Sequence, residues 1–251
     1  MNKIGIIGGS GLDDAPFFKN EKKIEIKTPF GKPSSTIKEG EIQDQKVITL
    51  ARHGRKHNII PSNVNYRANI WALKELGCRY ILATTAVGSL REKIKPGHIV
   101  LPNQFIDFTR NRKSTFFNEN KVIHTPMAEP FNKEISKLVI NVADSIGIKA
   151  HKNKTVITIE GPRFSTKAES HMFRSWGADI INMSSCPEVA LANEIGLHYV
   201  SIAMSTDYDC WKEDEETVSW ELIQKIMKDN SGNVLNIIQK AIPIIKDIDI
   251  V

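Results

Sequence analysis

Short runs of apolar and β-branched residues alternate with helical patterns along the whole of this 251-residue chain. The predicted strands are Lys3–Ile7, Lys46–Ala51, Tyr80–Thr85, His98–Leu101, Thr155–Ile159, Asp179–Met183 and His198–Met204. Alternation of this kind favours a mostly parallel sheet flanked by helices. Without a linker, repeat or low-complexity segment, we expect one domain over residues 1–251.

The predicted helices lie between these strands. Ser62 is placed to cap a helix that runs toward Gly77, and Pro187 fits the first turn of a helix that Gly196 ends. The C-terminal third, from about Thr217, is predicted to form two helices. A further helix is indicated by an apolar stripe made of Ile135, Leu138, Val139, Val142 and Ile146.

Composition narrows the possible partners and location. The net charge is +5, but the lysines are scattered and no nucleic-acid-binding motif is present, so we expect a diffuse field that attracts small anions. Cys78, Cys186 and Cys210 are widely spaced and odd in number, which favours free thiols over disulfides or a zinc site. We expect no signal peptide and no membrane helix, and hence a cytoplasmic protein.

Anion donors follow three predicted strands. Gly8 to Gly11 offers backbone N–H groups and the Ser10 hydroxyl after the first, although a plain tight turn is an equal alternative. Arg52, His53, Arg55 and His57 follow the second, where the alternative is an exposed basic loop. The segment Thr84–Ser89 follows the third and has a serine/threonine turn as its alternative.

Residues suited to a heteroaromatic ligand follow the later strands. Phe164 lies after Gly161-Pro162 and can stack on a nucleobase, while Met183 and Ser184 end another strand. Each of these side chains could equally belong to the core. Asp207 and Asp209 are the best candidates for proton transfer, with metal binding or helix capping as alternatives.

In order along nearly the whole chain, nine fragments resemble those of the methylthioadenosine phosphorylases, in the trimeric branch of the purine nucleoside phosphorylases. They are GGSGLDD, TPFGKPS, ARHGRKH, VNYRANIWALKELG, TTAVGSLRE, HTPMAEPF, TIEGPRFST, WGADIINM and STDYDCWKE. The resemblance implies a single α/β domain whose central mixed β-sheet curls into a distorted barrel flanked by helices. It also implies a homotrimer or a dimer of trimers.

The resemblance implies roles for individual positions. The phosphate-binding residues would be Ser10, Arg52, His53, Thr85, Ala86 and Ser184, the last replacing a threonine that is common in the family. The nucleoside-binding residues would be Met183 at the ribose, Phe164, Ser165, Asp207 and Asp209 at the base, His57 near the sugar, and His124 from a neighbouring subunit. Asp207 would also be the catalytic residue, because it would supply or hold a proton at N7.

Three further positions bear on selectivity. Relatives that prefer 6-oxopurines typically have Glu and Asn where this chain has Ser165 and Asp207, so the resemblance implies an adenine base. Trp220 and Ile223 would line the pocket for the 5' group, where an apolar wall suits a methylthio substituent. Trp220 is larger than the expected valine, Gln224 replaces an apolar residue, and the chain ends at Val251 before a tail found in longer relatives.

The expected function is therefore phosphorolysis of S-methyl-5'-thioadenosine to adenine and 5-methylthioribose 1-phosphate. Inorganic phosphate would be a co-substrate, and no metal or organic cofactor is expected. The alternatives are a phosphorylase preferring 5'-methylthioinosine, adenosine or inosine, a non-catalytic adenosine-binding protein, and an NAD(P)-dependent oxidoreductase. The oxidoreductase would need a G-x-G-x-x-G turn and an acidic residue such as Glu25 after a convincing helix.

Overall fold

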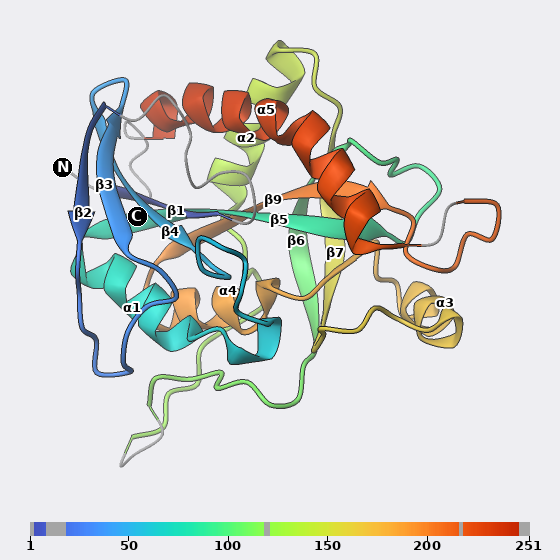
Figure 1. Ribbon diagram of the computed structural model, residues 1–251, viewed down its shortest axis with the longest axis horizontal. Helices are drawn as coiled ribbons and strands as arrows, with labels where there is room; N and C mark the ends of the chain where they lie inside the picture. The colour runs from blue at the N-terminus through green and yellow to red at the C-terminus, as the bar shows by residue number, and fades with distance from the viewer. Residues whose placement is uncertain (1–2, 9–18, 118–120, 216–217, 246–251) are drawn as a thin grey trace.

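The computed structural model describes residues 3–8, 19–117, 121–215 and 218–245 (Figure 1). Its strands are β1 Lys3–Gly8, β2 Lys19–Ile24, β3 Ile37–Ile42, β4 Gln45–Ala51, β5 Cys78–Ser89, β6 Ile99–Phe108, β7 Ala150–Ile159, β8 Ile180–Asn182 and β9 His198–Asp207. Its α-helices are α1 Tyr66–Glu75, α2 Lys133–Ser145, α3 Lys167–Ser175, α4 Ser185–Glu194 and α5 Trp220–Ile245, and residues Pro61–Asn63 form a short 3-10 turn.

The strands form a single mixed sheet that closes on itself. Within the described residues its order is β2-β3-β4-β1-β5-β8-β7-β6-β9, and β9 pairs again with β5. Strands β5, β8, β7, β6 and β9 therefore make a closed five-stranded barrel, and β1 to β4 extend the sheet from β5. The pair β5–β9 is parallel, whereas β5–β8 and β6–β9 are antiparallel. The expected mixed sheet curling into a barrel is confirmed.

Two strands, β2 and β3, were not expected from the sequence. Strand β2 has the sequence KNEKKI and lies at the edge of the sheet, where its side chains are mostly exposed. It pairs antiparallel with β3, not parallel with β1. A dinucleotide-binding unit needs a helix that returns the chain to a parallel neighbour of the first strand, so this topology argues against the oxidoreductase alternative.

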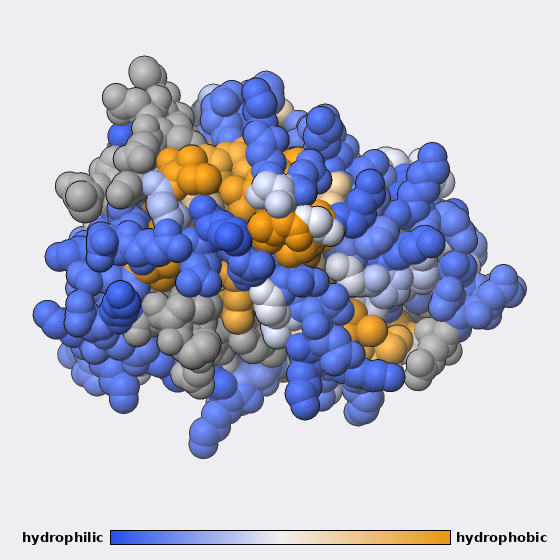
Figure 2. Space-filling model, turned by 90° about the horizontal axis from the view of Figure 1, so that it is seen from above, coloured by the Kyte–Doolittle hydropathy of each residue, from blue (hydrophilic) through white to orange (hydrophobic). Residues whose placement is uncertain are grey.

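The helices cover both faces of the sheet. Helices α2 and α5 pack together above it, and α1 and α4 pack together below it (Figure 1). Seen from above, the surface is mostly hydrophilic, with hydrophobic side chains exposed in patches near its centre (Figure 2). Among the described residues, no helix is long and apolar enough to cross a membrane.

Helix boundaries correct several expectations. The Asn65 side chain, not Ser62, caps α1 by accepting a hydrogen bond from the Ala68 N–H at 3.2 Å. The C-terminal region forms one long helix, α5, instead of two helices. Helix α3 was not predicted, although Thr166 and Glu169 form a capping box, a motif that can be recognised from the sequence. Gly196, with φ +69°, follows the end of α4 as expected.

Candidate functional site

A cavity of about 590 Å³ opens at the carboxyl ends of β4, β5, β8 and β9, beside the loop after β7 and the start of α5. Its volume is typical of a small-molecule site. Nearly all of the residues predicted for the site line it: Arg52, His53, His57, Thr85, Ala86, Phe164, Ser165, Met183, Ser184, Asp207, Asp209, Trp220 and Ile223. The segments are distant in sequence. Strands β4, β5 and β9 run parallel and present their carboxyl ends at one edge, whereas β8 brings its end to the site by pairing antiparallel with the last residues of β5.

Two predicted residues do not line this cavity. Ser10 lies outside the residues that the structure describes. His124 is exposed on the segment between β6 and α2 and is absent from the cavity lining. The described parts of this segment run downward and outward from the body of the molecule (Figure 1). The structure therefore does not place His124 at the cavity of its own chain.

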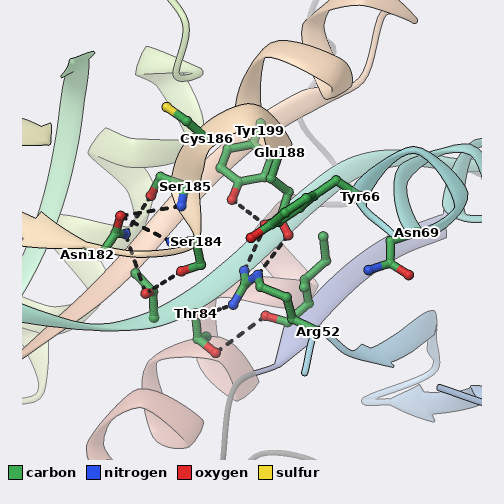
Figure 3. Close-up of polar contacts among 12 residues, drawn as sticks. Arg52, Tyr66, Asn69, Thr84, Asn182, Ser184, Ser185, Cys186, Glu188 and Tyr199 are labelled. Carbon is green, nitrogen blue, oxygen red and sulfur yellow. Dashed lines mark hydrogen bonds and ion pairs between the residues drawn. The ribbon is translucent and has the colours of Figure 1, made fainter. Parts of the chain in front are cut away.

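The guanidinium nitrogens of Arg52 are already hydrogen-bonded to other protein atoms (Figure 3). Its Nε and Nη2 atoms each donate to a carboxylate oxygen of Glu188 at 2.7 Å, and Nη1 donates to the Thr84 carbonyl at 2.9 Å. Glu188 is fully buried and also accepts a 2.6 Å hydrogen bond from the Tyr199 hydroxyl. Arg52 therefore cannot grip an anion through its Nε–Nη2 edge, and only its remaining N–H bonds can face a ligand.

Hydroxyl groups from β5 and the end of β8 meet in the same part of the cavity. The Thr85 and Ser184 hydroxyl oxygens lie 2.9 Å apart. Asn182 supports them, because its Nδ2 donates to Thr85 Oγ1 at 3.4 Å and to Ser185 Oγ at 2.7 Å (Figure 3). Fixed hydroxyl donors beside the Arg52 side chain make an anion-binding corner.

His53 contributes a neutral imidazole to this corner. Its Nδ1 lies 3.0 Å from the Ile59 carbonyl oxygen. A carbonyl only accepts, so Nδ1 carries the proton and Nε2 is left as an acceptor. Burial, together with the positive charge of Arg52, lowers the pKa of His53 to about 3. His53 can therefore accept a hydrogen bond from a protonated anion oxygen at neutral pH.

Asp207 provides a buried carboxyl group in the lining of the same cavity. One of its oxygens accepts from the Thr206 hydroxyl at 2.7 Å, and the other accepts from the Asp209 backbone N–H at 2.7 Å. Burial raises the pKa of Asp207 to about 6, and burial also raises the pKa of Asp209. A carboxyl group with a raised pKa can donate a proton to a ligand nitrogen.

Two glycines allow the backbone to approach side chains of the site closely. A Cβ atom at Gly88 would lie 2.9 Å from Asp207 Oδ1 and 3.0 Å from Ile181 Cγ2, so only glycine leaves room for the carboxyl group. Gly161 has φ +67°, and a Cβ atom there would lie 2.5 Å from Met183 Sδ. Both glycines therefore allow ligand-facing side chains to sit against β5 and the loop after β7.

The wall near α5 is aromatic and apolar. The rings of His57 and Trp220 stack with centroids 4.8 Å apart and planes at 28°. His57 has φ +50°, and its pKa is lowered by burial and by Arg52. Ile223, Met227 and Val218 also line this part of the cavity, with Gln224 among them.

Several residues of the site were not anticipated from the sequence. Glu188 accepts hydrogen bonds from Arg52, and Tyr199 donates to Glu188. Lys56 and Met227 line the cavity. Arg112, whose side chain is 1% exposed, donates to the carbonyls of Met183 at 2.8 Å and Glu160 at 2.7 Å. It thereby joins the loop after β7 to the end of β8. The one signal in the sequence for any of these residues was that Glu188 is charged and lies within an apolar helical segment.

The described residues of the site do not form a metal centre. In the described part of the chain, no group of three or more His, Cys, Asp or Glu side chains is placed to hold a metal ion. The three cysteines are free, and Cys78 and Cys186 are buried. The cavity lining therefore combines an anion-binding corner, a buried carboxyl group and an apolar wall.

Comparison with known proteins gives the family. The phosphorylase superfamily matches residues 3–243. S-methyl-5'-thioadenosine phosphorylase from Danio rerio is 54% identical over 98% of this chain and 90% of its own length, and the protein of that name from Xenopus tropicalis is also 54% identical, over 98% and 90%. The methylthioadenosine phosphorylase of Schistosoma mansoni in complex with adenine superimposes with a TM-score of 0.95 at 43% identity, covering 99% of this chain and 93% of that one.

A second structure adds a ligand to the comparison. A mutant adenosine/methylthioadenosine phosphorylase from Schistosoma mansoni in complex with methylthioadenosine gives a TM-score of 0.92 at 42% identity, covering 99% of this chain and 93% of that chain. The family match and the relatives agree over nearly the full length. This chain therefore belongs to the phosphorylase superfamily and, within it, to the S-methyl-5'-thioadenosine phosphorylases.

Proposed function

We propose that this chain catalyses the phosphorolysis of S-methyl-5'-thioadenosine to adenine and 5-methylthioribose 1-phosphate. The observation that carries the proposal is the placement of a buried carboxyl group of raised pKa, Asp207, in the same 590 Å³ cavity as the Arg52–Thr85–Ser184 corner. The carboxyl group is suited to a purine leaving group, and the corner is suited to an inorganic anion. Membership of the phosphorylase superfamily supports phosphate as that anion.

In this proposal phosphate binds to Arg52, His53, Thr85, Ala86 and Ser184, with Ser10 as a further donor. The two hydroxyls and the free N–H bonds of Arg52 donate to phosphate oxygens. His53 Nε2 accepts from the P–OH group, because its Nδ1 proton is already bonded to the Ile59 carbonyl. The phosphate is thus oriented by donors and an acceptor together, which fixes the oxygen that attacks.

The proposed reaction breaks the bond between the sugar and the base and forms a bond between the sugar and phosphate. The C1'–N9 bond breaks and its electron pair stays with adenine, while C1' gains positive charge. A phosphate oxygen donates an electron pair to C1' and forms the new C–O bond. Protonated Asp207 gives its proton to N7, so adenine leaves as a neutral base. Bound phosphate also stabilises the developing cation, because its negative charge lies against C1'.

The remaining residues orient the nucleoside. Phe164 stacks on the base, Ser165 and Asp209 bond its edge, and Met183 lies against the ribose. An ionised or hydrogen-bond-accepting carboxyl at this edge suits the N6 amino group of adenine, whereas a 6-oxopurine presents an acceptor there. His57, Trp220 and Ile223 enclose the 5' group. This wall is mainly apolar, which favours a methylthio substituent.

We also propose that the enzyme acts as a homotrimer or dimer of trimers in the cytoplasm. His124 is exposed and does not line the cavity of its own chain, which supports a contact with the substrate of a neighbouring copy. Val122, beside it, is 78% exposed and would be covered in such a contact. The three free cysteines suit a reducing compartment.

Adenine release from methylthioadenosine, measured with and without phosphate, tests the activity. We expect release to depend on phosphate and to yield one 5-methylthioribose 1-phosphate for each adenine. Equal release in phosphate-free buffer with free methylthioribose as product would identify a hydrolase, and binding without release would identify a nucleoside-binding protein. Parallel assays with adenosine, inosine and 5'-methylthioinosine compare the remaining alternatives.

A further inference from the structure

A second cavity, of about 660 Å³, lies apart from the catalytic one. It is bordered by the chain after β5, the start of β7 and the last turn of α3. Its lining consists of Arg91, Glu92, Lys93, Ile94, Lys149, His151, Lys154, Arg174 and Asp179. None of these residues lines the catalytic cavity.

The second cavity carries an excess of positive charge. It has five arginine and lysine side chains against two carboxylates. Asp179 lies 3.1 Å from Arg91 and 3.8 Å from Lys154, and Glu92 is paired at 3.0 Å with Lys212 from outside the lining. Both carboxylates are therefore already matched by cations.

Two of the remaining cations, Lys93 and Lys149, lack acidic partners in the described part of the chain. Within the described residues, Lys93 and Lys149 make no ion pair, and both are exposed at the cavity. The charges of these two lysines repel each other and those of the arginines unless an anion lies between them. The arrangement is thus one that a negatively charged ligand would stabilise.

Arg174 provides a separate observation. Its guanidinium carbon lies 3.4 Å over the ring of Trp211, and its buried Nη1 atom has no hydrogen-bond partner in the described structure. Burial and the nearby Arg91 charge lower the pKa of Arg174, and Glu92 opposes this shift. A buried donor without a partner is costly, and a turn of the Arg174 side chain toward the cavity would let Nη1 form a charge-assisted bond with an anionic oxygen there.

The lining also indicates which part of a ligand is recognised. Ile94 is the only aliphatic side chain in it, and the one aromatic ring of the lining, the His151 imidazole, is already 2.9 Å from His98 Nδ1. Inorganic phosphate would reach only some of the cations around a cavity of 660 Å³. A chain of phosphate groups would place negative charge against Lys93, Lys149 and Arg174 together.

We propose that this cavity binds a polyphosphate chain, either inorganic polyphosphate or the phosphates of a nucleoside di- or triphosphate. The site lies close to the catalytic one in the fold but is distinct from it. Gly88 and Ile181 line the catalytic cavity, whereas Arg91 and Asp179, on the same two chain segments, line this one.

Calorimetric titration with tripolyphosphate tests the proposal on the full-length enzyme. The test variant is Lys93→Gln/Lys149→Gln, and the control is Lys137→Gln/Lys240→Gln, which removes the same charge at exposed positions outside the cavity. We expect the dissociation constant to rise by roughly tenfold or more in the test variant, because two charged contacts are lost. It should stay unchanged in the control, and the KM for phosphate in phosphorolysis should be that of the wild type in both.

Competing explanations give different results. Equal affinity in the wild type and both variants would assign binding to the catalytic cavity or to diffuse charge, and would overturn the proposal. Absence of binding would also overturn it, as would binding of a single-stranded oligonucleotide without binding of tripolyphosphate. ATP binding that is weakened by the same test variant supports the proposal with a nucleotide as the source. Tripolyphosphate binding without ATP binding supports it with inorganic polyphosphate.

Discussion

Arg52 and Glu188 are 136 positions apart in the sequence and form a two-bond ion pair at the base of the catalytic cavity, with both N···O distances at 2.7 Å. Arg52 follows β4 and Glu188 lies on α4, so the pair joins the outer part of the sheet to the helix beneath it. The Tyr199 hydroxyl bonds the same carboxylate. The arginine proposed to meet phosphate is thus held in place by a carboxylate that no ligand reaches.

We expect Glu188→Gln to destabilise the protein and to raise the KM for phosphate. Removing one partner of a buried ion pair leaves an uncompensated charge and typically costs about 3–5 kcal/mol. Urea denaturation measures the free energy of unfolding, and initial rates at varied phosphate measure KM. Arg163→Gln is the matched control, since Arg163 makes a similar two-bond pair with Glu169 on the exposed surface and should change neither quantity appreciably. An unchanged phosphate KM in a folded Glu188→Gln enzyme would separate Glu188 from the positioning of Arg52.

The second prediction concerns proton transfer by Asp207. Its pKa is raised to about 6, so the protonated form is lost as pH rises through that value. We expect kcat/KM for methylthioadenosine to fall above pH about 6, approaching tenfold per pH unit. In Asp207→Asn this limb should disappear and turnover should drop by roughly 10²–10⁴-fold. The ratio of methylthioinosine to methylthioadenosine efficiency should increase, because an amide can donate to O6.

The exposed Asp214→Asn is the control for this experiment and should leave the pH profile unchanged. A descending limb that persists in Asp207→Asn would assign the titration to another group. Full activity across that range in the wild type would show that the N7 proton comes from solvent.

His53 leads to a prediction for stability in acid. Its pKa is about 3 in the folded protein, below the ordinary value of 6.5, so the unfolded chain binds the additional proton between these two values. The free energy of unfolding therefore falls as pH is lowered from 6.5 toward 3, by at most about 1.4 kcal/mol per pH unit from this group. Asp207 has the opposite effect between pH 3.8 and about 6, because its pKa is raised on folding.

The His53 contribution is isolated by comparing wild type with His53→Gln in urea denaturation at several pH values. The variant lacks the titrating ring, so its stability should decline less steeply below pH 6.5. Parallel curves for the two proteins would show that His53 is not buried in its neutral form.

The sequence predicted the strands whose core-facing residues form continuous apolar runs, such as β1 and β9. It did not predict β2, because an edge strand of exposed Lys, Asn and Glu residues has no apolar pattern. Likewise, Asn230 to Asn233 are weak helix formers, yet they lie within α5, where packing of Val234 and Ile237 outweighs propensity.

The candidate site shows a similar division. Arg52, Thr85 and Asp207 were predicted because each lies at the end of an apolar strand, and strand ends gather at one edge. Glu188 and Arg112 were missed, since their partners are fixed by tertiary packing and no local spacing records such contacts. The predicted grip of Arg52 on phosphate was also incomplete, because Glu188 takes the edge that a bidentate ligand would use.

Gly88 gives a steric prediction. A Cβ atom there would come within 2.9 Å of Asp207 Oδ1, so Gly88→Ala should displace the carboxyl group and lower kcat on methylthioadenosine. The phosphate KM should change much less, because the atoms nearest to that Cβ belong to Asp207, Ile181 and Asp209 and not to Thr85 or Ser184. Gly232→Ala is the control: its Cβ would meet nothing within 4 Å, and alanine should stabilise α5 by up to about 1 kcal/mol. Wild-type kcat in Gly88→Ala would mean that Asp207 tolerates displacement.

The final prediction concerns Trp220 and the 5' group of the nucleoside. Trp220 is 37% exposed and stacks on His57 at 4.8 Å, so it both forms the wall and holds the imidazole. We expect methylthioadenosine to exceed adenosine in kcat/KM by roughly 10- to 200-fold, since an apolar wall suits the methylthio group and leaves a hydroxyl unpaired. Trp220→Val should maintain or widen this ratio by relieving crowding, whereas Trp220→His should narrow it by offering a partner for the hydroxyl.

A further variant and a control separate crowding of the 5' group by Trp220 from the stacking of Trp220 on His57. Trp220→Phe keeps an aromatic ring beside His57 with less bulk, so it should behave as Trp220→Val if crowding decides the ratio, and as the wild type if the stack decides it. Trp176→Val removes an exposed tryptophan outside the cavity and should have no effect. If the Val, His and Phe variants at position 220 all retain the wild-type ratio, Trp220 does not contact the 5' group. Selectivity would then depend on Ile223, Met227 and Val218, which are the other apolar residues of this part of the cavity lining.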